Sequence, residues 1–290
     1  MKANPYHDIA RLLIRCPDRQ GIVASVSNFL YNHRANITAL DQHTTCLQEG
    51  AFFMRVEFKL PQLEATLPVL TDAFKETIVP KYDMEFRISH AGSLKRVALF
   101  VSKMDHALME LLWRWKRGEL AMDIACVVSN HEDCKHAVES FGLQYFYIPV
   151  SNGNKVEAER EILQKLRGNV DFVILARYMQ ILSREFVQEY PYKIINIHHS
   201  FLPAFVGADP YTKAFERGVK LVGATAHFVT EDLDEGPIIE QDVARVNHRF
   251  STDRLKELGR DIEKFVLARA VKWYLEDRII VDGNKTIVFI

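Results

Sequence analysis

The sequence predicts an α/β chain of two domains, in which a ferredoxin-like βαββαβ unit precedes a doubly wound, mostly parallel sheet. In residues 9–88, strand and helix patterns follow one another in the order βαββαβ. From Lys95 onward, near-continuous apolar strands alternate with helices, which indicates a parallel sheet covered on both faces. Residues 90–94, with the sequence His-Ala-Gly-Ser-Leu, are expected to link the two. We therefore place the domains at residues 1–89 and 95–290.

Composition limits the possible partners. The chain has 290 residues, of which 48% are hydrophobic and 26% charged, as in ordinary globular proteins. Its formal net charge of −1 gives the protein no overall positive potential that would attract a polyanion, so we expect no nucleic-acid partner. No apolar run approaches the roughly 18 residues of a membrane helix, and the first residues lack the apolar core of a signal peptide. We expect a cytoplasmic protein that does not bind membranes.

The cysteines agree with that location. Cys16, Cys46, Cys126 and Cys134 show no C-x-x-C spacing, and each lies beside apolar residues. Disulfides are rare in the reducing cytoplasm, so we expect four reduced and buried thiols.

The elements of the first domain follow from periodicity and turn residues. Apolar residues recur at helical spacing after the turn Pro17–Gly21, and a polar turn at residues 48–50 separates two strand-like runs. Strands are expected at residues 9–15, 36–46, 51–58 and 84–89, with helices at 22–32 and 63–78.

The first turn and helix carry a family resemblance. This region resembles ACT domains in two stretches, Cys16-Pro-Asp-Arg-Gln-Gly-Ile-Val-Ala24 and the following Val-Ser-Asn-Phe-Leu at 26–30. The resemblance implies a regulatory fold that binds small amino acids at paired interfaces, with Asp18, Gln20 and Gly21 as candidate effector residues and a homo-oligomer of at least two chains. Free N–H groups at the helix start would stabilise a ligand carboxylate. Alternatively, Asp18 and Gly21 only shape the turn and cap the helix.

The second domain shows a repeated strand and helix rhythm. Strands are expected at residues 96–101, 124–129, 145–148, 172–176 and 194–197, with helices at 106–116, 133–141, 155–166 and 253–276. Ligands of such sheets bind beyond the carboxyl ends of the strands. Three polar motifs lie at strand ends, after Ala176, after Ile197 and after Phe228.

The second and third motifs contain groups suited to acyl chemistry. Asn196 and His198 are two residues apart, so in an extended segment both project to one face, and His199 projects to the other. An amide and a protonated imidazole can stabilise an oxyanion. Asp234 could keep His198 charged or accept a proton from water. We expect the neighbouring His199, Ser200 and His227 to support these groups.

All three motifs together resemble the folate-dependent formyltransferase family. The resemblance covers about residues 96–242 and includes Leu-Ala-Arg-Tyr-Met-Gln-Ile-Leu-Ser at 175–183, Asn196 with His198, and Asp234-Glu-Gly-Pro237. It implies that Asn196, His198 and Asp234 are catalytic and that the first motif frames a pterin. The implied substrate-binding residues are Tyr178, Met179, Gln180, Ile181, Leu182, Val229 and Asp232.

The acceptor of the formyl group is expected to be water. Residues 101–106 after the first strand of this domain contain no glycine, so backbone amides cannot closely approach a phosphate there, and Asp105 would repel it. Only about fourteen residues follow the last expected helix, too few for the second domain of methionyl-tRNA formyltransferases.

The whole chain resembles the formyltetrahydrofolate deformylases, most closely in residues 194–205, where His199 replaces the proline usual in the transferases. This implies hydrolysis of 10-formyltetrahydrofolate in one-carbon metabolism and purine biosynthesis, with folate as substrate and no cofactor. Asp209 departs from the relatives, which often have a basic residue or Asn there, and would weaken a contact with the folate tail.

Three other interpretations are open at this point. A formyltransferase could use an unidentified amine, such as an amino sugar nucleotide. A silent domain could only sense folate or an amino acid. A zinc hydrolase could use His198, His199, His227 and Asp234, but the sequence lacks the ligand pairs at i, i+2 or i, i+4 that metal sites usually show, so we expect no metal.

Overall fold

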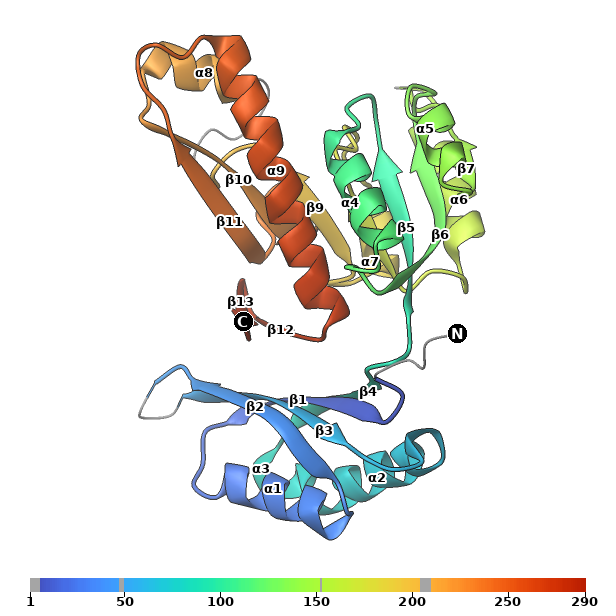
Figure 1. Cartoon of the computed structure of the whole chain (residues 1–290), viewed down its shortest axis with the longest axis vertical. Helices are drawn as coiled ribbons and strands as arrows, with labels where there is room; N and C mark the ends of the chain where they lie inside the picture. Colours follow the sequence, from blue (N-terminus) through green and yellow to red (C-terminus); the bar gives the residue numbers. More distant parts are fainter. Residues whose placement is uncertain (1–5, 47–49, 152, 204–209) are drawn as a thin grey trace. The chain divides into compact units, whose positions relative to one another are not determined.

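The computed structural model describes residues 6–46, 50–151, 153–203 and 210–290. The chain divides into two compact units (Figure 1). The smaller unit comprises Met1–Leu94 together with Glu276–Asp282 and Ile287–Ile290, and the larger comprises Lys95–Leu275 with Gly283–Thr286. Most of the carboxyl-terminal segment, which we placed in the second domain, thus groups with the first. Within the described residues, no helix is both long and apolar enough to cross a membrane.

The smaller unit has the predicted ferredoxin-like order. Its elements are β1 (Ile9–Pro17), α1 (Ile22–Asn32), β2 (Asn36–Thr44), β3 (Ala51–Lys59), α2 (Leu63–Thr77), α3 (Val79–Tyr82) and β4 (Glu85–His90). The strands form an antiparallel sheet in the order β2-β3-β1-β4. The predicted second helix ends at Thr77 and a short α3 follows, with Pro80 in its first turn, where a proline is well tolerated.

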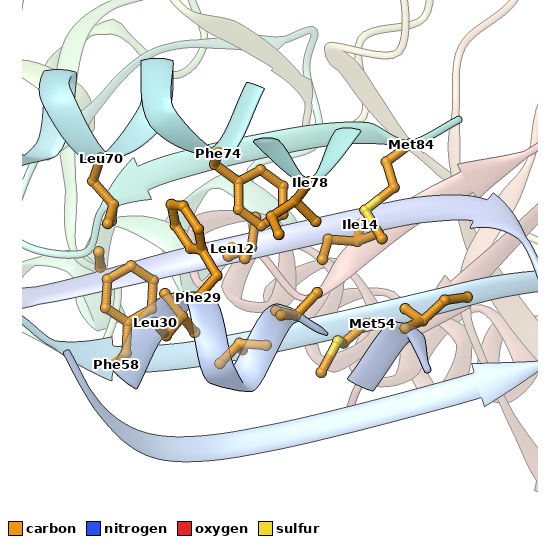
Figure 2. Packing of buried hydrophobic residues seen from close by; sticks show 14 of the residues in the cluster. Leu12, Ile14, Phe29, Leu30, Met54, Phe58, Leu70, Phe74, Ile78 and Met84 are labelled. Atoms are coloured by element: carbon orange, nitrogen blue, oxygen red, sulfur yellow. The ribbon is translucent and has the colours of Figure 1, made fainter. Parts of the chain in front are cut away.

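The three helices cover one face of this sheet (Figure 1). Alternation along β1 directs Leu12 and Ile14 toward the helices, where they pack with Phe29 and Phe74 in one buried cluster (Figure 2). The edge strand β2 contains no buried residue. Cys46, which follows this strand, is exposed, so the prediction of a buried thiol is wrong there.

The other cysteines lie in the cores. Cys16, Cys126 and Cys134 are buried and free, and Cys46 is also free. Burial raises the pKa of each buried thiol to about 11, so these three stay protonated and unreactive at neutral pH.

The second face of the sheet carries the returning carboxyl-terminal segment. Phe289 packs with Leu13 and Phe53. Asp277 is 2% exposed in its side chain and lies 2.9 Å from Arg87 Nη2 and 3.7 Å from Arg11 Nη1. The Ser89 hydroxyl donates a hydrogen bond of 2.9 Å to the same carboxylate. A buried carboxylate therefore ties the end of the chain to β1 and β4.

Removing this carboxylate leaves two arginines without their buried partner. Asp277→Ala is expected to lower the free energy of unfolding by about 3 kcal/mol. Glu85→Ala is the control, because Glu85 pairs with Arg15 at 3.3 Å but is 77% exposed; its cost is expected to stay below about 1 kcal/mol. Urea unfolding of both variants measures the difference, and equal costs would contradict this account of the tether.

The larger unit contains a seven-stranded sheet in the order β11-β10-β9-β8-β5-β6-β7. Its elements are β5 (Lys95–Val101), α4 (His106–Lys116), β6 (Met122–Ser129), α5 (Lys135–Ser140), β7 (Tyr145–Tyr147), α6 (Lys155–Leu166), β8 (Phe172–Leu175), α7 (Arg184–Glu189), β9 (Ile194–His198), α8 (Pro210–Arg217), β10 (Leu221–Phe228), β11 (Ile238–Arg245) and α9 (Thr252–Leu275). A final hairpin pairs β12 (Ile279–Asp282) with β13 (Lys285–Val288).

The predicted mostly parallel sheet is confirmed. Strands β5 to β9 pair in parallel, whereas β10 is antiparallel to both β9 and β11. Helices α6 and α7 pack on one face of β5, β6 and β8. Helix α9 contacts α4 and strands β9, β10 and β11. This arrangement leaves the ends of β8 and β9 and the β10–β11 loop beside one another.

Candidate active site

A cavity of about 370 Å³ lies between the segment after β8, the end of β9 and the β10–β11 loop. The predicted substrate-binding residues all border it: Tyr178, Met179, Gln180, Ile181, Leu182, Val229 and Asp232. Asn196, His198 and Asp234 border it as well, with His199 and His227. Ser200 is not among the lining residues. The cavity thus brings the three separated motifs together.

Strand pairing explains how the second and third motifs meet. In the antiparallel register of β9 and β10, Asn196 lies opposite His227. We predicted that all three motifs follow the carboxyl ends of parallel strands. That is wrong for the third, because β10 runs opposite to β9 and the motif belongs to the loop that returns to β11.

This loop depends on Gly236. A Cβ atom there would lie 1.8 Å from the carbonyl oxygen of Phe228, so only glycine allows the backbones to approach this closely. The backbone N–H of Phe228 donates to the carbonyl of Pro237 at 2.9 Å, which closes the base of the loop. Asp234 has a positive φ of 59° within it. The turn thereby directs Asp234 back toward β9.

The Asp234 carboxylate lies beside two of the three cavity histidines, His198 and His227. Its Oδ2 lies 3.2 Å from His198 Nδ1, and its Oδ1 lies 3.7 Å from His227 Nε2. The hydrogen bond from His198 lowers the pKa of Asp234 below its ordinary value, outweighing the opposing effect of burial. His198 Nε2 is buried and has no hydrogen-bond partner among the described residues. Asp234 therefore holds one nitrogen of this cavity-lining imidazole, and the other has no partner within the described residues.

His227 fixes the amide of Asn196. The carbonyl of Phe228 can only accept, so His227 Nδ1, at 2.9 Å, carries a proton. Burial lowers the pKa of His227, which favours the neutral ring with an accepting Nε2. Asn196 Nδ2 lies 3.2 Å from this Nε2 and donates to it. The amide is thereby oriented, and its second N–H is not used by His227.

His199 differs from its prediction. We expected its side chain on the face opposite His198, but it lines the same cavity, and its ring centroid lies 5.2 Å from that of His198. The strict alternation of a strand ends at His198, where β9 ends. Burial, reinforced by the charge of Arg177, lowers the pKa of His199 to about 4. His199 is therefore neutral at physiological pH.

A shift of this size makes stability depend on pH. The unfolded state binds a proton near pH 6.5 and the folded state only near about 4, so protonation of His199 reduces stability as the pH falls through this window. Between pH 6.5 and about pH 4, the free energy of unfolding of His199→Gln is expected to fall less than that of the wild type. Urea unfolding at the two pH values measures this, with a substitution of the exposed His248 as control. An unchanged slope would contradict a buried neutral imidazole.

Residues that the sequence did not reveal hold the loops in place. Ser102 Oγ accepts from the N–H of Met179 at 2.9 Å and donates to Asn130 at 2.7 Å. Thr225 Oγ1 donates to the carbonyl of Ser200 at 2.9 Å and accepts from the N–H of Leu202 at 3.1 Å. Each hydroxyl sits within a strand or at its end, where sequence alone gives no sign of a partner.

In the residues that the structure describes, no group of three His, Cys, Asp or Glu side chains is arranged to hold a metal ion. Asp209, which we connected with the folate tail, lies outside the described residues.

Comparison with known proteins agrees with the two units. A formyl transferase family model matches residues 95–271, and an ACT domain model matches residues 10–74. The formyltetrahydrofolate deformylase of Bacillus subtilis (strain 168) is 52% identical over 97% of this chain and 94% of its own. The chain belongs to the formyltetrahydrofolate deformylase family.

Solved structures separate this deformylase family from the transferases. The crystal structure of a formyltetrahydrofolate deformylase from Pseudomonas syringae pv. tomato is 48% identical, with a TM-score of 0.92, and covers 97% of this chain and 94% of its own. Glycinamide ribonucleotide transformylase 1 from Symbiobacterium toebii is 26% identical, with a TM-score of 0.64 over 68% of this chain and 95% of its own. The similarity to the deformylases therefore includes the ACT domain.

The ACT domain of this deformylase family member places Asp18, Gln20 and Gly21 in an exposed turn between β1 and α1. Gly21 is the N-cap residue of α1 and has a φ of 87°, and among the described residues the helix start has no side-chain cap hydrogen bond. A cavity of about 360 Å³ is lined by other residues, among them Arg15, Asp83 and Glu85. The three predicted effector residues do not line it.

Proposed function

We propose that the chain hydrolyses 10-formyltetrahydrofolate to formate and tetrahydrofolate. The observation that carries this proposal is the cluster of Asn196, His198 and Asp234 around one cavity, with an unpartnered His198 Nε2. The apolar side chains of Met179, Ile181 and their neighbours would hold the pterin. No metal or organic cofactor is required, because protein groups supply each proton transfer.

The attack on the formyl group places negative charge on its oxygen. Asn196 has one N–H left for that oxygen, since the other is bound by His227. A protonated His198 would donate from Nε2, while its Nδ1–H stays on Asp234. Both donors are already in place before the charge develops, so the protein dipoles need little reorganisation to stabilise it.

Asp234 is suited to direct the water. Its Oδ2 is held by His198, whereas Oδ1 is 3.7 Å from a His227 nitrogen that carries no proton. Oδ1 can therefore accept a proton from water as the oxygen attacks the formyl carbon. The carbon–nitrogen bond then breaks, the folate nitrogen takes up the proton that Asp234 accepted from water, and the formyl carbon leaves as formic acid, which releases its proton to solvent as formate.

Water is favoured over a phosphorylated amine by the segment after β5. The hydroxyl of Ser102 is already bonded to Asn130 and Met179, and Asp105 follows it. A phosphate held by the backbone of this segment would meet the carboxylate of Asp105.

Formate release by the purified, chelator-treated protein tests the proposal. We expect stoichiometric formate and tetrahydrofolate without any added amine, and the same rate when candidate amines are present. Tetrahydrofolate that appears only when an amine is present, together with a formylated amine and without formate, would instead identify a transferase. Tight folate binding without turnover would identify a silent sensor.

Three further properties belong to the proposal. We place the protein in the cytoplasm, where its free thiols would remain reduced and formate would enter one-carbon metabolism and purine biosynthesis. We propose a homo-oligomer of at least two chains, supported by the exposed edge strand β2, and light scattering tests it. A small amino acid is the proposed effector of the ACT domain.

A further inference from the structure

A second cavity of about 250 Å³ adjoins the formyl site, with Arg177 and His199 lining both. His199 therefore lies between the two cavities. Its ring lies beside the rings of His198 and Tyr211, at centroid distances of 5.2 and 6.2 Å. No hydrogen bond within the described part of the chain locks this imidazole in place.

The second cavity has a positively charged wall. Lys256 and Arg260 lie four residues apart on α9, and Glu263 follows three residues later, so all three share one face of the helix. In the described residues neither Lys256 nor Arg260 has an ion-pair partner. Two cations of the wall are therefore available to a ligand.

The carboxylate of Glu263, which also lines this cavity, already has partners within the protein. Glu263 is 1% exposed, lies 2.7 Å from His106 Nε2 and accepts from the Tyr211 hydroxyl at 2.9 Å. Arg177 Nε lies 3.5 Å away, an ion-pair distance without a hydrogen bond. Burial alone would raise the pKa of Glu263, but His106 and Arg177 hold it below its ordinary value.

Donor and acceptor atoms remain unused at this wall. Arg177 Nε and His106 Nδ1 are buried and have no hydrogen-bond partner among the described residues. The His106 side chain is only 10% exposed. A guanidinium group can bind both oxygens of a carboxylate, which suits a small carboxylate anion.

We propose that this second cavity binds formate as it leaves the formyl site; the inference rests on the proposed hydrolysis. Formate arises beside the ionised Asp234, which repels it. The cations beyond His199 attract it. The product would therefore pass His199 toward Arg177, Lys256 and Arg260 while the folate still occupies the first cavity.

Direct binding tests this site without turnover. We expect isotope-labelled formate to bind the wild-type protein, as measured by broadening of its NMR signal, and to bind Arg260→Gln about tenfold more weakly. Lys256→Gln is expected to weaken binding, and Arg260→Lys to weaken it less than Arg260→Gln. Arg254→Gln is the matched control on the same helix, since Arg254 is exposed and pairs with Glu257 at 2.8 Å.

Kinetics provide the second measurement. Formate is expected to inhibit the wild type noncompetitively with the folate, because the two occupy different cavities. Unchanged formate binding by Arg260→Gln, an equal loss in Arg254→Gln, or purely competitive inhibition would overturn the site. If the wild type binds formate but does not hydrolyse the folate, and Arg260→Gln loses that binding, the formate site would stand and the proposed hydrolysis would be rejected.

Discussion

Asp234→Asn is expected to lower kcat by about a thousandfold, because one change removes two functions. The amide cannot accept a proton from water, and it no longer holds a charged His198 at 3.2 Å. His198→Ala is expected to cost at least about a hundredfold through loss of the oxyanion donor. Since both residues act on the same transition state, the double variant is expected to be little worse than Asp234→Asn.

Asp232→Asn is the control for this experiment. Asp232 belongs to the same loop and lines the same cavity, but in the described residues no hydrogen bond or ion pair joins its carboxylate to a cavity histidine. Its substitution is expected to change KM more than kcat. Steady-state formate release measures kcat and KM for the wild type and all four variants. Retention of more than about a tenth of kcat by Asp234→Asn would remove this carboxylate from the mechanism.

Asn196→Ala is expected to lower kcat by about a hundredfold to a thousandfold, the usual cost of one oxyanion donor. His227→Ala removes the acceptor that orients the amide at 3.2 Å, so it is expected to reproduce part of this loss without contacting the substrate. The two effects pass through one amide and should not add. A double-mutant cycle with independent, additive losses would show that His227 acts by another route.

Much of the site could be predicted because its groups are close in sequence. The strand Ile194–His198 fixes the spacing of Asn196 and His198, and a strand's alternation places both on one side. The motif at residues 175–183 was also recognisable, since it follows a short, fully buried strand. Local pattern was sufficient for these features.

Features that depend on distant pairing were not accessible. The antiparallel direction of β10 follows from its register with β9, which no local pattern in residues 221–228 reveals. The position of His199 depends on where the strand ends, and its lowered pKa depends on burial and on the charge of Arg177. The carboxyl-terminal tether likewise requires Asp277 to meet Arg11 and Arg87, which are far away in sequence.

The smaller unit shows the same difference between local features and features that depend on strand order. Periodicity was sufficient for its helices, because Phe29 and Phe74 lie on apolar faces that the sheet buries (Figure 2). It was insufficient for Cys46, because apolar neighbours do not reveal that β2 is an edge strand. Burial is decided by strand order, and strand order is a property of the assembled sheet.

A single turnover in water enriched in heavy oxygen tests most directly whether solvent is the nucleophile. With the enzyme in excess over 10-formyltetrahydrofolate and no amine present, the account predicts one heavy oxygen atom in each formate released by the wild type. It predicts almost no formate from Asp234→Asn on the same timescale. Formate without the label, or labelled formate formed equally fast by Asp234→Asn, would contradict attack by a water molecule that Asp234 activates.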